Sequence, residues 1–341
     1  MGARESVPDG GPSPAGTGKE VIACVGAGRM GAGIAHVFAY AGHPVRLIDA
    51  KPRPEEEFRR LAAETLAGIA DGLRALSEFG LLDEDDIARI LPRITILPRG
   101  RVAEGLADAR FVFEGVPEVL EAKREAFALI GAHAAADAVV ASTTSTFLAT
   151  TLAGMIARPE RYLNAHWLNP AYLVPLVELS PAPATGEDAI RALEGLLEAV
   201  GKVPVRCAAS PGYIVPRLQA LCMNEAARMV EEGVATAEDI DRAVRVGFGF
   251  RFAVLGLLEF IDWGGGDILY YASRYLVEAT GQERFASPAI VGRNMAEGNI
   301  GLKTGRGFYD FSTMDVPAYR KERLGRFLAL LRHGGMARPP A

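Results

Sequence analysis

The sequence predicts an α/β fold in which a doubly wound, Rossmann-type parallel sheet is followed by an all-α C-terminal domain. Short apolar strands alternate with amphipathic helices from residues 21–25 to about residue 206, which is typical of a mostly parallel sheet. From Ser210 onward the pattern changes to helices only. We therefore expect a disordered leader (1–18), a Rossmann-like domain (19–209), a helical domain (210–330) and a tail (331–341).

The elements of the first domain are expected in a regular order. The strand at 21–25 enters a glycine-rich turn that opens a helix, and a second strand at 44–48 ends in Asp49. Apolar residues then recur at helical spacing from Phe58 to Leu76, which predicts one long helix to about Phe79. A shorter helix is expected at 83–90. The remaining predicted strands are 94–97, 111–113, 138–142, 162–165, 174–179 and 203–206, with helices at 118–133 and 190–200 between them.

The second domain is expected to contain helices at 218–232, 237–247, 254–263 and 268–278. Thr236 is placed to cap the second of these, because a threonine oxygen accepts from free N–H groups in a first helical turn. A last helix after Pro317 is expected to fray toward the C-terminus.

The composition is that of an ordinary globular protein. Its 341 residues are 49% hydrophobic and 23% charged, which allows a substantial core and two domains. A formal net charge of −5 offers no basic face to nucleic acid or anionic lipid, and no apolar run reaches the ~18 residues of a membrane span. The leader has no apolar core of a signal peptide.

Cysteine usage predicts a reducing compartment. Cys24, Cys207 and Cys222 lie in apolar stretches without CxxC spacing, so the sequence indicates neither a disulfide framework nor a metal site. We expect a cytoplasmic protein that binds small molecules.

The glycine-rich turn has the pattern G-x-G-x-x-G at Gly26, Gly28 and Gly31. Gly26 permits the tight turn, Gly28 lets the backbone approach a pyrophosphate, and Gly31 lets the helix pack close to the strand. The N-terminus of the helix adds free N–H groups and the positive end of its dipole. The predicted cofactor-binding residues of the turn are Gly26, Ala27, Gly28, Arg29, Met30 and Gly31.

Asp49 specifies the cofactor. It follows the second strand, eighteen residues after Gly31, where a carboxylate accepts the ribose hydroxyls and repels a 2′-phosphate. The predicted cofactor is therefore NAD and not NADP. Lys51 is the only nearby cation that would favour NADP by attracting its 2′-phosphate.

Several further segments together resemble the 3-hydroxyacyl-CoA dehydrogenase family, and their order and spacing agree from about residue 20 to 312. They are GAGRMG in the turn, FEGVPEVLEAK at 113–123, ASTTST at 141–146, AHWLNP at 165–170, LVEL at 176–179, PGYIVPRL at 211–218, EGVATAEDID at 232–241 and KTGRGFYDF at 303–311. The resemblance implies an NAD-dependent dehydrogenase of fatty acid metabolism. Its substrate would be a short-chain 3-hydroxyacyl-CoA such as 3-hydroxybutyryl-CoA, oxidised at the 3-hydroxyl.

His166 is the candidate base for this reaction. Oxidation of a secondary alcohol requires a base to take the hydroxyl proton while carbon gives hydride to the nicotinamide, and an imidazole suits that task. His166 lies just past a predicted strand, at the crevice edge where such sheets bind ligands. Glu178, twelve residues later on the adjoining strand, would orient the ring and stabilise the imidazolium. The alternative for a lone histidine is a hydrogen-bonded core residue.

The resemblance assigns roles to five other residues. Ser145 corresponds to a serine that hydrogen-bonds the reacting oxygen, although it also suits a helix N-cap. Asn169 corresponds to a residue near the nicotinamide, with a turn-forming Asn-Pro as the alternative. Glu118, Lys123 and Lys303 correspond to cofactor contacts, and on residue type alone the first two are equally well interpreted as solvated helix charges.

The chain departs from the family at the substrate end. Pro216 replaces an asparagine that helps to hold the substrate, and a proline is tolerated there only in a first helical turn. Residues 65–72 contain no basic residue where acyl-CoA users present a lysine to the CoA phosphates, leaving Arg59 and Arg74 to compensate. Extra glycine in IDWGGGD (261–267) and Leu257 in place of a common proline would reshape the pocket.

These departures leave other functions open. The first alternative keeps the chemistry and changes the substrate to a free hydroxy acid, a sugar acid, or a carnitine-like or carrier-protein-bound alcohol. The second is a non-catalytic, crystallin-like NAD-binding protein.

The family resemblance also implies a homodimer. Its interface would use an apolar stripe on the first helix of the second domain, formed by Leu218, Leu221, Met223, Ala226 and Val230. Burial of the same stripe in the monomer's own core is the alternative.

Overall fold

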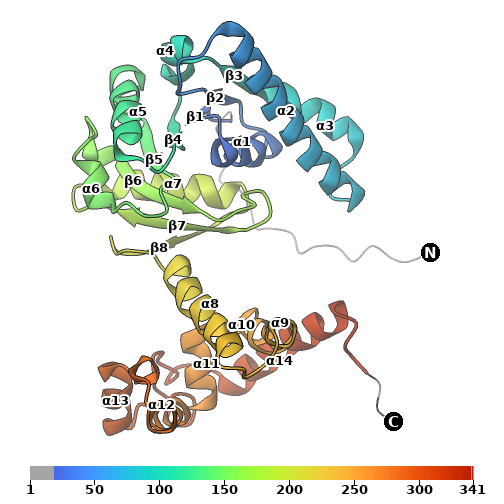
Figure 1. The fold of residues 1–341 in the computed structure, drawn as a ribbon, viewed down its shortest axis with the longest axis vertical. Helices are drawn as coiled ribbons and strands as arrows, with labels where there is room; N and C mark the ends of the chain where they lie inside the picture. Colours follow the sequence, from blue (N-terminus) through green and yellow to red (C-terminus); the bar gives the residue numbers. More distant parts are fainter. Residues whose placement is uncertain (1–18, 339, 341) are drawn as a thin grey trace. The chain divides into compact units, whose positions relative to one another are not determined.

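The computed structural model describes residues 19–338 and 340 (Figure 1). The chain forms two compact units that divide between Leu221 and Cys222. The division falls within one continuous helix, α8 (Val215–Glu231). The domain boundary expected near residues 208–212 stays a proposal. The predicted leader at 1–18 lies outside the described residues, as do residues 339 and 341 of the tail.

The first unit is built on one eight-stranded sheet in the order β3-β2-β1-β4-β5-β6-β7-β8. Every neighbouring pair is parallel except β6 and β7, which are antiparallel. The strands are β1 (Ile22–Val25), β2 (Val45–Ile48), β3 (Ile94–Leu97), β4 (Phe111–Glu114), β5 (Val139–Ser142), β6 (Tyr162–Trp167), β7 (Leu176–Pro181) and β8 (Val203–Arg206). This arrangement confirms the doubly wound sheet expected from the alternation of strands and helices.

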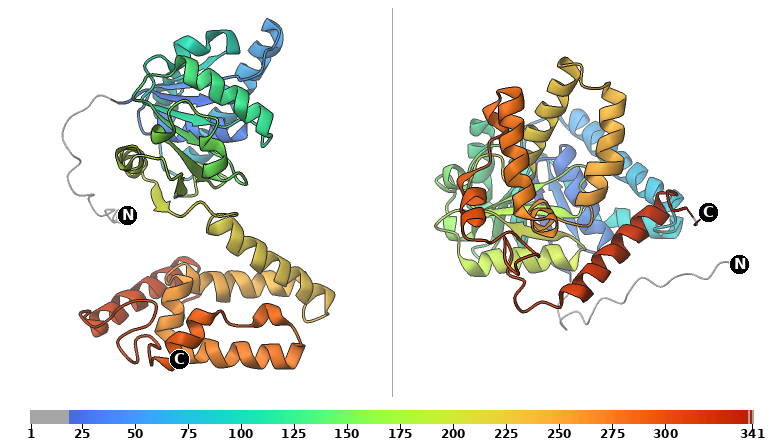
Figure 2. Two further views of the ribbon diagram at one scale, coloured as in Figure 1. Left: turned by 90° about the vertical axis from the view of Figure 1, so that its left-hand side faces the viewer. Right: turned by 90° about the horizontal axis from the view of Figure 1, so that it is seen from below.

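Helices cover both faces of the sheet (Figures 1 and 2). One face packs against α1 (Arg29–Tyr40), α2 (Glu55–Glu78), α3 (Glu84–Ile90) and α7 (Glu187–Ala199). The other packs against α4 (Val102–Leu106), α5 (Leu120–His133) and α6 (Ala149–Ala153). Short 3₁₀ turns occur at η1 (Leu91–Arg93), η2 (Arg99–Arg101) and η3 (Pro159–Arg161). The long helix predicted to end near Phe79 is thus confirmed as α2.

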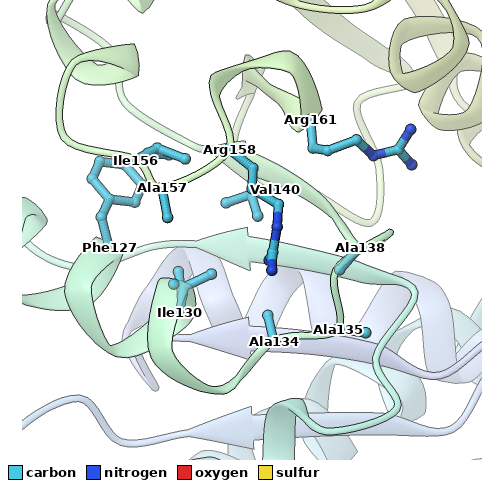
Figure 3. A pocket seen from close by; sticks show the side chains of 11 residues that line it. Phe127, Ile130, Ala134, Ala135, Ala138, Val140, Ile156, Ala157, Arg158 and Arg161 are labelled. Carbon is cyan, nitrogen blue, oxygen red and sulfur yellow. The ribbon is translucent and has the colours of Figure 1, made fainter.

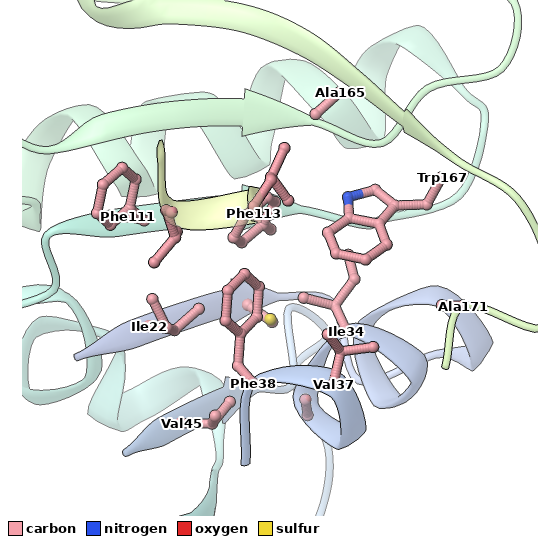
Figure 4. Close-up of a cluster of buried hydrophobic side chains, with 14 of the residues drawn as sticks. Ile22, Ile34, Val37, Phe38, Val45, Phe111, Phe113, Ala165, Trp167 and Ala171 are labelled. Atoms are coloured by element: carbon pink, nitrogen blue, oxygen red, sulfur yellow. The ribbon is translucent and has the colours of Figure 1, made fainter. Parts of the chain in front are cut away.

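The side chains of each strand point alternately to the two faces of the sheet and contribute to one apolar cluster on each face. Ile22 and Cys24 of β1 join one apolar cluster, whereas Ala23 and Val25 join the other, because successive strand residues point to opposite faces. In the first cluster the Phe38 ring of α1 lies 5.4 Å from the Phe113 ring of β4, measured between centroids (Figure 4). Both faces of the sheet are therefore packed against helices, and this packing fixes the positions of the strand ends.

The second unit is helical. It continues α8 with α9 (Ala237–Ala243), the π-helical η4 (Val244–Phe248), α10 (Gly249–Phe252), α11 (Leu257–Gly264), α12 (Gly266–Thr280), η5 (Glu283–Phe285), α13 (Ala289–Ala296) and α14 (Val316–His333). The predicted Thr236 cap is confirmed, since its hydroxyl accepts from the Asp239 N–H at 3.1 Å. Among the described residues, no helix combines the length and apolar character needed to cross a membrane.

Three predicted helices begin three residues away from their expected starts, since α7, α8 and α11 begin at Glu187, Val215 and Leu257. The helix expected at 254–263 begins only at Leu257, because residues 253–256 form a turn after α10. Gly256 occupies the N-cap with an extended backbone, and its N–H donates to the Glu259 carboxylate at 3.1 Å. This local cap sets the start of α11, which the apolar pattern placed three residues too early.

The sheet order locates the ligand edge. β1 is flanked by β2 on one side and β4 on the other, so the direction of strand order reverses beside it. In open α/β sheets ligands bind outside the carboxyl ends of the strands at such a point. The segments that follow β1, β2, β4, β5 and β6 all begin at this edge, and they contain the predicted cofactor-binding residues except Lys303.

A small cavity elsewhere in this unit is not a candidate site. Its volume is about 20 Å³, and Phe127, Ile130 and Ile156 contribute to its apolar lining (Figure 3). It lies where β5 and β6 begin, at the edge of the sheet opposite the carboxyl ends.

Candidate functional site

The glycine turn after β1 has the shape that a pyrophosphate requires. Gly26 has φ +118°, and a Cβ there would lie 2.5 Å from the Gly115 carbonyl oxygen. A Cβ on Gly31 would lie 2.0 Å from the Gly26 carbonyl oxygen, so both positions require glycine. A Cβ on Gly28 would meet no atom within 4 Å, and no side chain caps the N-terminus of α1. The turn therefore leaves open space beside uncapped helix N–H groups, which fits an anionic cofactor group.

Asp49 lies at the end of β2 and is almost fully buried, with 4% of its surface exposed. Its Oδ2 accepts from Arg53 Nε at 2.6 Å, and its Oδ1 accepts from the Lys51 N–H at 3.2 Å. The expectation that Lys51 is the only competing cation was wrong, because the segment turns back and brings Arg53 onto the carboxylate. A carboxylate oxygen accepts more than one hydrogen bond, so Oδ1 retains capacity for a ribose hydroxyl.

His166 and Glu178 are brought together by the antiparallel pair β6 and β7. The two residues are direct register partners, and His166 Nδ1 lies 2.8 Å from Glu178 Oε2. Both are buried, at 5% and 0% exposed. The other oxygen, Oε1, accepts from the N–H groups of Ile214 at 2.9 Å and Val215 at 2.8 Å. With Nδ1–H donated to this carboxylate, the ring's Nε2 carries the lone pair that takes a proton.

Ser145 lies in the loop after β5, between two residues that Glu118 holds. The Thr144 hydroxyl donates to Glu118 Oε1, and Thr146 donates to the same oxygen from its N–H at 3.0 Å and its hydroxyl at 2.7 Å. Burial alone would raise the pKa of Glu118, but these hydrogen bonds and the charge of Lys123 outweigh it and lower the pKa to about 2. An ionised Glu118 thus anchors both neighbours of an exposed serine.

Lys123 belongs to a buried ion pair. Its Nζ lies 3.0 Å from Glu114 Oε2 and 3.3 Å from Glu118 Oε2, and its side chain is 1% exposed. Glu114 also accepts from the Ser142 hydroxyl at 2.6 Å and the Val116 N–H at 2.8 Å. The interpretation of Lys123 as a solvated helix charge was therefore wrong. Cofactor contact by Glu118 and Lys123 stays a prediction, since the bonds described here go to protein groups.

Asn169 and Pro216 occupy the positions expected of a turn and a helix start. Asn169 is exposed just after β6 and precedes a cis peptide bond to Pro170. Pro216 is the second residue of α8, in the first turn, where a missing N–H removes no helical hydrogen bond. The role of Asn169 beside the nicotinamide stays a prediction.

Lys303 lies in the helical unit and pairs with Asp267, its Nζ 3.1 Å from Oδ2. The position of Gly265 in the glycine-rich motif before Asp267 requires glycine. Its φ is +112°, and a Cβ on it would lie 2.8 Å from Lys303 Nζ. The loop that carries Lys303 is anchored by the buried Asp262, which accepts from the Phe308 and Tyr309 N–H groups at 3.0 and 2.8 Å. Contact of Lys303 with the cofactor stays a prediction.

Sequence reasoning missed Glu114, Arg53 and Tyr213. Glu114 carried a detectable signal, since it is an acidic residue at the end of the otherwise apolar strand β4. Tyr213 follows a Pro-Gly turn, and its ring stacks on the His166 ring with centroids 4.8 Å apart. Among the described residues no group of three or more His, Cys, Asp or Glu side chains is placed to hold a metal.

Two family models match the chain in succession. The model described as "3-hydroxyacyl-CoA dehydrogenase, NAD binding domain" matches residues 21–210, and that described as "3-hydroxyacyl-CoA dehydrogenase, C-terminal domain" matches residues 212–311. Together the two models cover most of both units.

Curated relatives agree in name with these models. The chain is 35% identical over 297 residues to 3-hydroxyadipyl-CoA dehydrogenase of Escherichia coli K12, covering 86% of this chain and 59% of that protein. It is 32% identical over 299 residues to human mitochondrial hydroxyacyl-coenzyme A dehydrogenase, covering 85% of this chain and 90% of that protein. The chain thus spans less than two thirds of the first relative and nearly the whole length of the second.

Solved structures share the fold along most of the chain. A 3-hydroxyacyl-CoA dehydrogenase from Archaeoglobus fulgidus superposes with a TM-score of 0.72 at 30% identity, covering 93% of this chain and all of that one. An NAD-dependent 5-formyl-3-hydroxy-2-methylpyridine 4-carboxylic acid 5-dehydrogenase gives a TM-score of 0.66 at 26% identity, covering 92% and 98%. The second structure is named for a substrate that is not a thioester.

Proposed function

The chain belongs to the 3-hydroxyacyl-CoA dehydrogenase family and is an NAD-dependent oxidoreductase acting on CH–OH donors, and we propose that its substrate is a short-chain 3-hydroxyacyl-CoA. The reaction is oxidation of the 3-hydroxyl group to the 3-oxo form. The observation that carries the proposal is the buried pair of His166 and Glu178, whose atoms Nδ1 and Oε2 lie 2.8 Å apart.

His166 is proposed to take the hydroxyl proton at Nε2 and to return it in the reverse direction. Glu178 holds the ring in the tautomer that leaves Nε2 free, and its negative charge stabilises the imidazolium. Ser145, exposed in a loop that Glu118 anchors, donates a hydrogen bond to the reacting oxygen. NAD, when bound, supplies the acceptor for the hydride.

The residues proposed to hold NAD at the ligand edge lie on four segments, which follow β1, β2, β4 and β6. The turn from Gly26 to Gly31 receives the pyrophosphate, and Asp49 accepts a ribose hydroxyl. Asn169 after β6 is proposed to contact the nicotinamide end. Glu118 and Lys123 line the segment after β4, where they also order the Ser145 loop.

A free hydroxy acid is the second candidate substrate, and the surface of α2 favours it. Gly72 leaves no side chain for a CoA phosphate, and a Cβ there would lie 3.2 Å from the His36 ring. The two cations that were expected to compensate are paired with acids, Arg59 with Glu55 and Arg74 with Asp71. The pyridine carboxylic acid dehydrogenase among the structural relatives supports a non-thioester substrate within the same fold.

Initial rates of NADH formation separate these substrates. We expect 3-hydroxybutyryl-CoA to give a higher kcat/KM than matched free 3-hydroxy acids, sugar acids and carnitine. Preference for a free acid by a factor of a hundred, about 2.7 kcal/mol in transition-state terms, would overturn the thioester proposal. Absence of turnover with every substrate would favour the crystallin-like alternative, which the intact set of Ser145, His166 and Glu178 argues against.

Replacing Asp49 with asparagine is expected to weaken NADH binding by about 10- to 100-fold, the usual cost of losing a charged hydrogen-bond partner. The same change releases Arg53 and removes the charge that repels a 2′-phosphate, so NADPH binding is expected to improve. Fluorescence titration with NADH and NADPH measures both. Asp71→Asn, which alters an exposed acid on α2, is the matched control. Unchanged cofactor preference in Asp49→Asn would contradict the role of this carboxylate.

A homodimer and a cytoplasmic location are proposed as well. The side chains of Leu218, Leu221, Met223 and Val230 on α8 are exposed, and we propose that a second copy covers them. Light scattering on the purified protein should give twice the chain mass, and a monomer at all concentrations would contradict the dimer. The cytoplasmic proposal is supported by Cys24, Cys207 and Cys222, which all carry free thiols, and fractionation of the source cells tests it.

A further inference from the structure

We propose that Tyr213 is a positioning residue for the reaction, which supports the imidazolium form of His166 through its ring and ties the Ser145 loop to it through its hydroxyl. The inference rests on the proposed function of His166 as the base. It goes beyond that function because Glu178 fixes the imidazole only at one ring nitrogen.

The Tyr213 ring lies flat against the His166 ring. The two centroids are 4.8 Å apart and the ring planes differ by 9°, and Tyr213 is 7% exposed. Glu178 contacts the edge of the imidazole at Nδ1, whereas Tyr213 covers its face. The carboxylate restrains the ring at one nitrogen and the phenol restrains its tilt, so together they define the direction of Nε2.

Hydrogen bonds hold the phenol in place. The Tyr213 hydroxyl accepts from Asn164 Nδ2 at 2.9 Å and donates to the Thr144 carbonyl oxygen at 2.8 Å. Asn164 is itself 1% exposed and donates to the Phe147 carbonyl oxygen at 2.9 Å. Thr144 immediately precedes Ser145, so the hydroxyl joins the base and the loop of the serine in one network.

The backbone is bent so that this ring and the Glu178 contacts form together. Tyr213 has φ +45°, the only positive φ of a non-glycine residue in the described part of the chain, and it follows Gly212 at φ +77°. A bulky residue rarely adopts this left-handed conformation, and such residues concentrate at functional sites. The next two N–H groups, of Ile214 and Val215, both donate to Glu178 Oε1. One short segment therefore positions both partners of His166.

The aromatic face favours a charged imidazole. A cation over the face of an aromatic ring is attracted by the ring quadrupole, so protonated His166 gains more from the stack than neutral His166. The ionisable groups around the stack are Glu178, the phenol itself, and, interacting with that phenol, Glu118 and Cys207. Burial raises the pKa of Tyr213, which keeps the phenol neutral throughout the working range.

The sign of the expected pH effect follows from this preference. Alcohol oxidation requires the neutral imidazole as the proton acceptor, whereas the stack with Tyr213 favours the imidazolium. Loss of the aromatic face should therefore move the acid limb of kcat/KM toward lower pH, by about one pH unit for a typical partly buried cation–π contact. A residue that acted only in folding would change protein yield or stability and leave this limb in place.

The test compares Tyr213→Leu with Tyr213→Phe in the full-length protein, in the direction of NADH formation. Tyr213→Leu should shift the acid limb down by about one unit and lower kcat more than it changes KM. Tyr213→Phe keeps the face, so its limb should stay at the wild-type pH, with a smaller loss of kcat from the freed Ser145 loop. NADH titration is expected to give wild-type affinity for both variants.

A fluorinated series keeps the test decisive if Tyr213→Leu does not fold. Phenylalanine and pentafluorophenylalanine at position 213 share nearly the same shape but differ in the sign of the ring's electrostatic face, so the limb should move to lower pH with fluorination. If the acid limb of kcat/KM lies at the same pH in the Leu, Phe and fluorinated variants, and still depends on His166, the proposed role of Tyr213 is overturned. The proposed role of His166 as the base would then remain. Wild-type kcat in His166→Gln would overturn the proposed base, and the inference with it.

Discussion

Replacing His166 with alanine is expected to lower kcat by about 10²- to 10⁴-fold and to leave NADH affinity nearly unchanged. The expected range is the usual contribution of a positioned general base. His166 lies within β6, whereas the pyrophosphate and ribose contacts are assigned to segments after β1 and β2. Loss of the imidazole therefore removes the proton acceptor and leaves the cofactor cradle intact. Initial rates of NADH formation and fluorescence titration with NADH measure the two quantities.

Two further variants control this experiment. His166→Gln retains a donor toward Glu178, which the alanine variant leaves without a partner in a buried site, and it should be equally inactive because an amide does not take the proton. His36→Gln alters another buried histidine, which stacks on Tyr172 and lies outside the proposed site, and it should retain wild-type kcat. Wild-type activity in His166→Ala would show that another group is the base.

Replacing Lys123 with methionine is expected to destabilise the first unit by about 3–5 kcal/mol, because it removes one partner of a fully buried ion pair. Glu114 is 0% exposed, and without the ammonium at 3.0 Å it keeps only the donors from Ser142 and Val116. An uncompensated buried carboxylate either unfolds the unit or takes up a proton. Calorimetry should show a melting temperature lower by roughly 6–20 °C for a domain of this size.

The neighbouring residue gives the matched control. Arg124 points outward from the same turn of α5 and pairs with Glu121 at 3.6 Å with more than half of each side chain exposed, so Arg124→Met should cost less than about 1 kcal/mol. The double variant Glu114→Gln with Lys123→Met should recover part of the loss, since neither charge remains. Equal melting temperatures for Lys123→Met and Arg124→Met would contradict the buried pair.

The contact between His166 and Glu178, the proposed base and its partner, could be predicted from the sequence because its geometry is a property of strand register. Two strands that pair antiparallel bring residues twelve apart into direct opposition when the connection has the right length, as β6 and β7 do for His166 and Glu178. The glycine turn was predictable for a similar reason. Gly26 and Gly31 are required by close backbone contacts within one β–α unit, and such local contacts leave a fixed spacing in the sequence.

Other contacts could not be predicted because they depend on how distant segments close on one another. The sequence places Lys123 on a helix but does not say which helical charges turn inward, and its partner Glu114 comes from the preceding strand. Arg53 reaches Asp49 only through the local turn after β2. Tyr213 contacts His166 from 47 positions further along the chain, and no periodicity of the sequence indicates such a contact.

The substrate end is the part that sequence patterns describe least. Pro216 occupies the first turn of α8, where it satisfies helix geometry but presents no polar group to a substrate. Gly72 lies over the His36 ring, so α2 presents no side chain at this position of the stretch where acyl-CoA users carry a lysine. The residues proposed to bind NAD and to supply the base therefore do not determine the acyl carrier, which depends on contacts outside these motifs.

Isotope transfer tests the central claim most directly. The wild-type protein is incubated with acetoacetyl-CoA and NADH that carries deuterium at both C4 positions, and the product is examined by mass spectrometry. The proposed function predicts 3-hydroxybutyryl-CoA with one deuterium at C3. Failure to consume NADH, or a reduced product without deuterium at C3, would contradict hydride exchange between NAD and a 3-oxoacyl thioester in this protein.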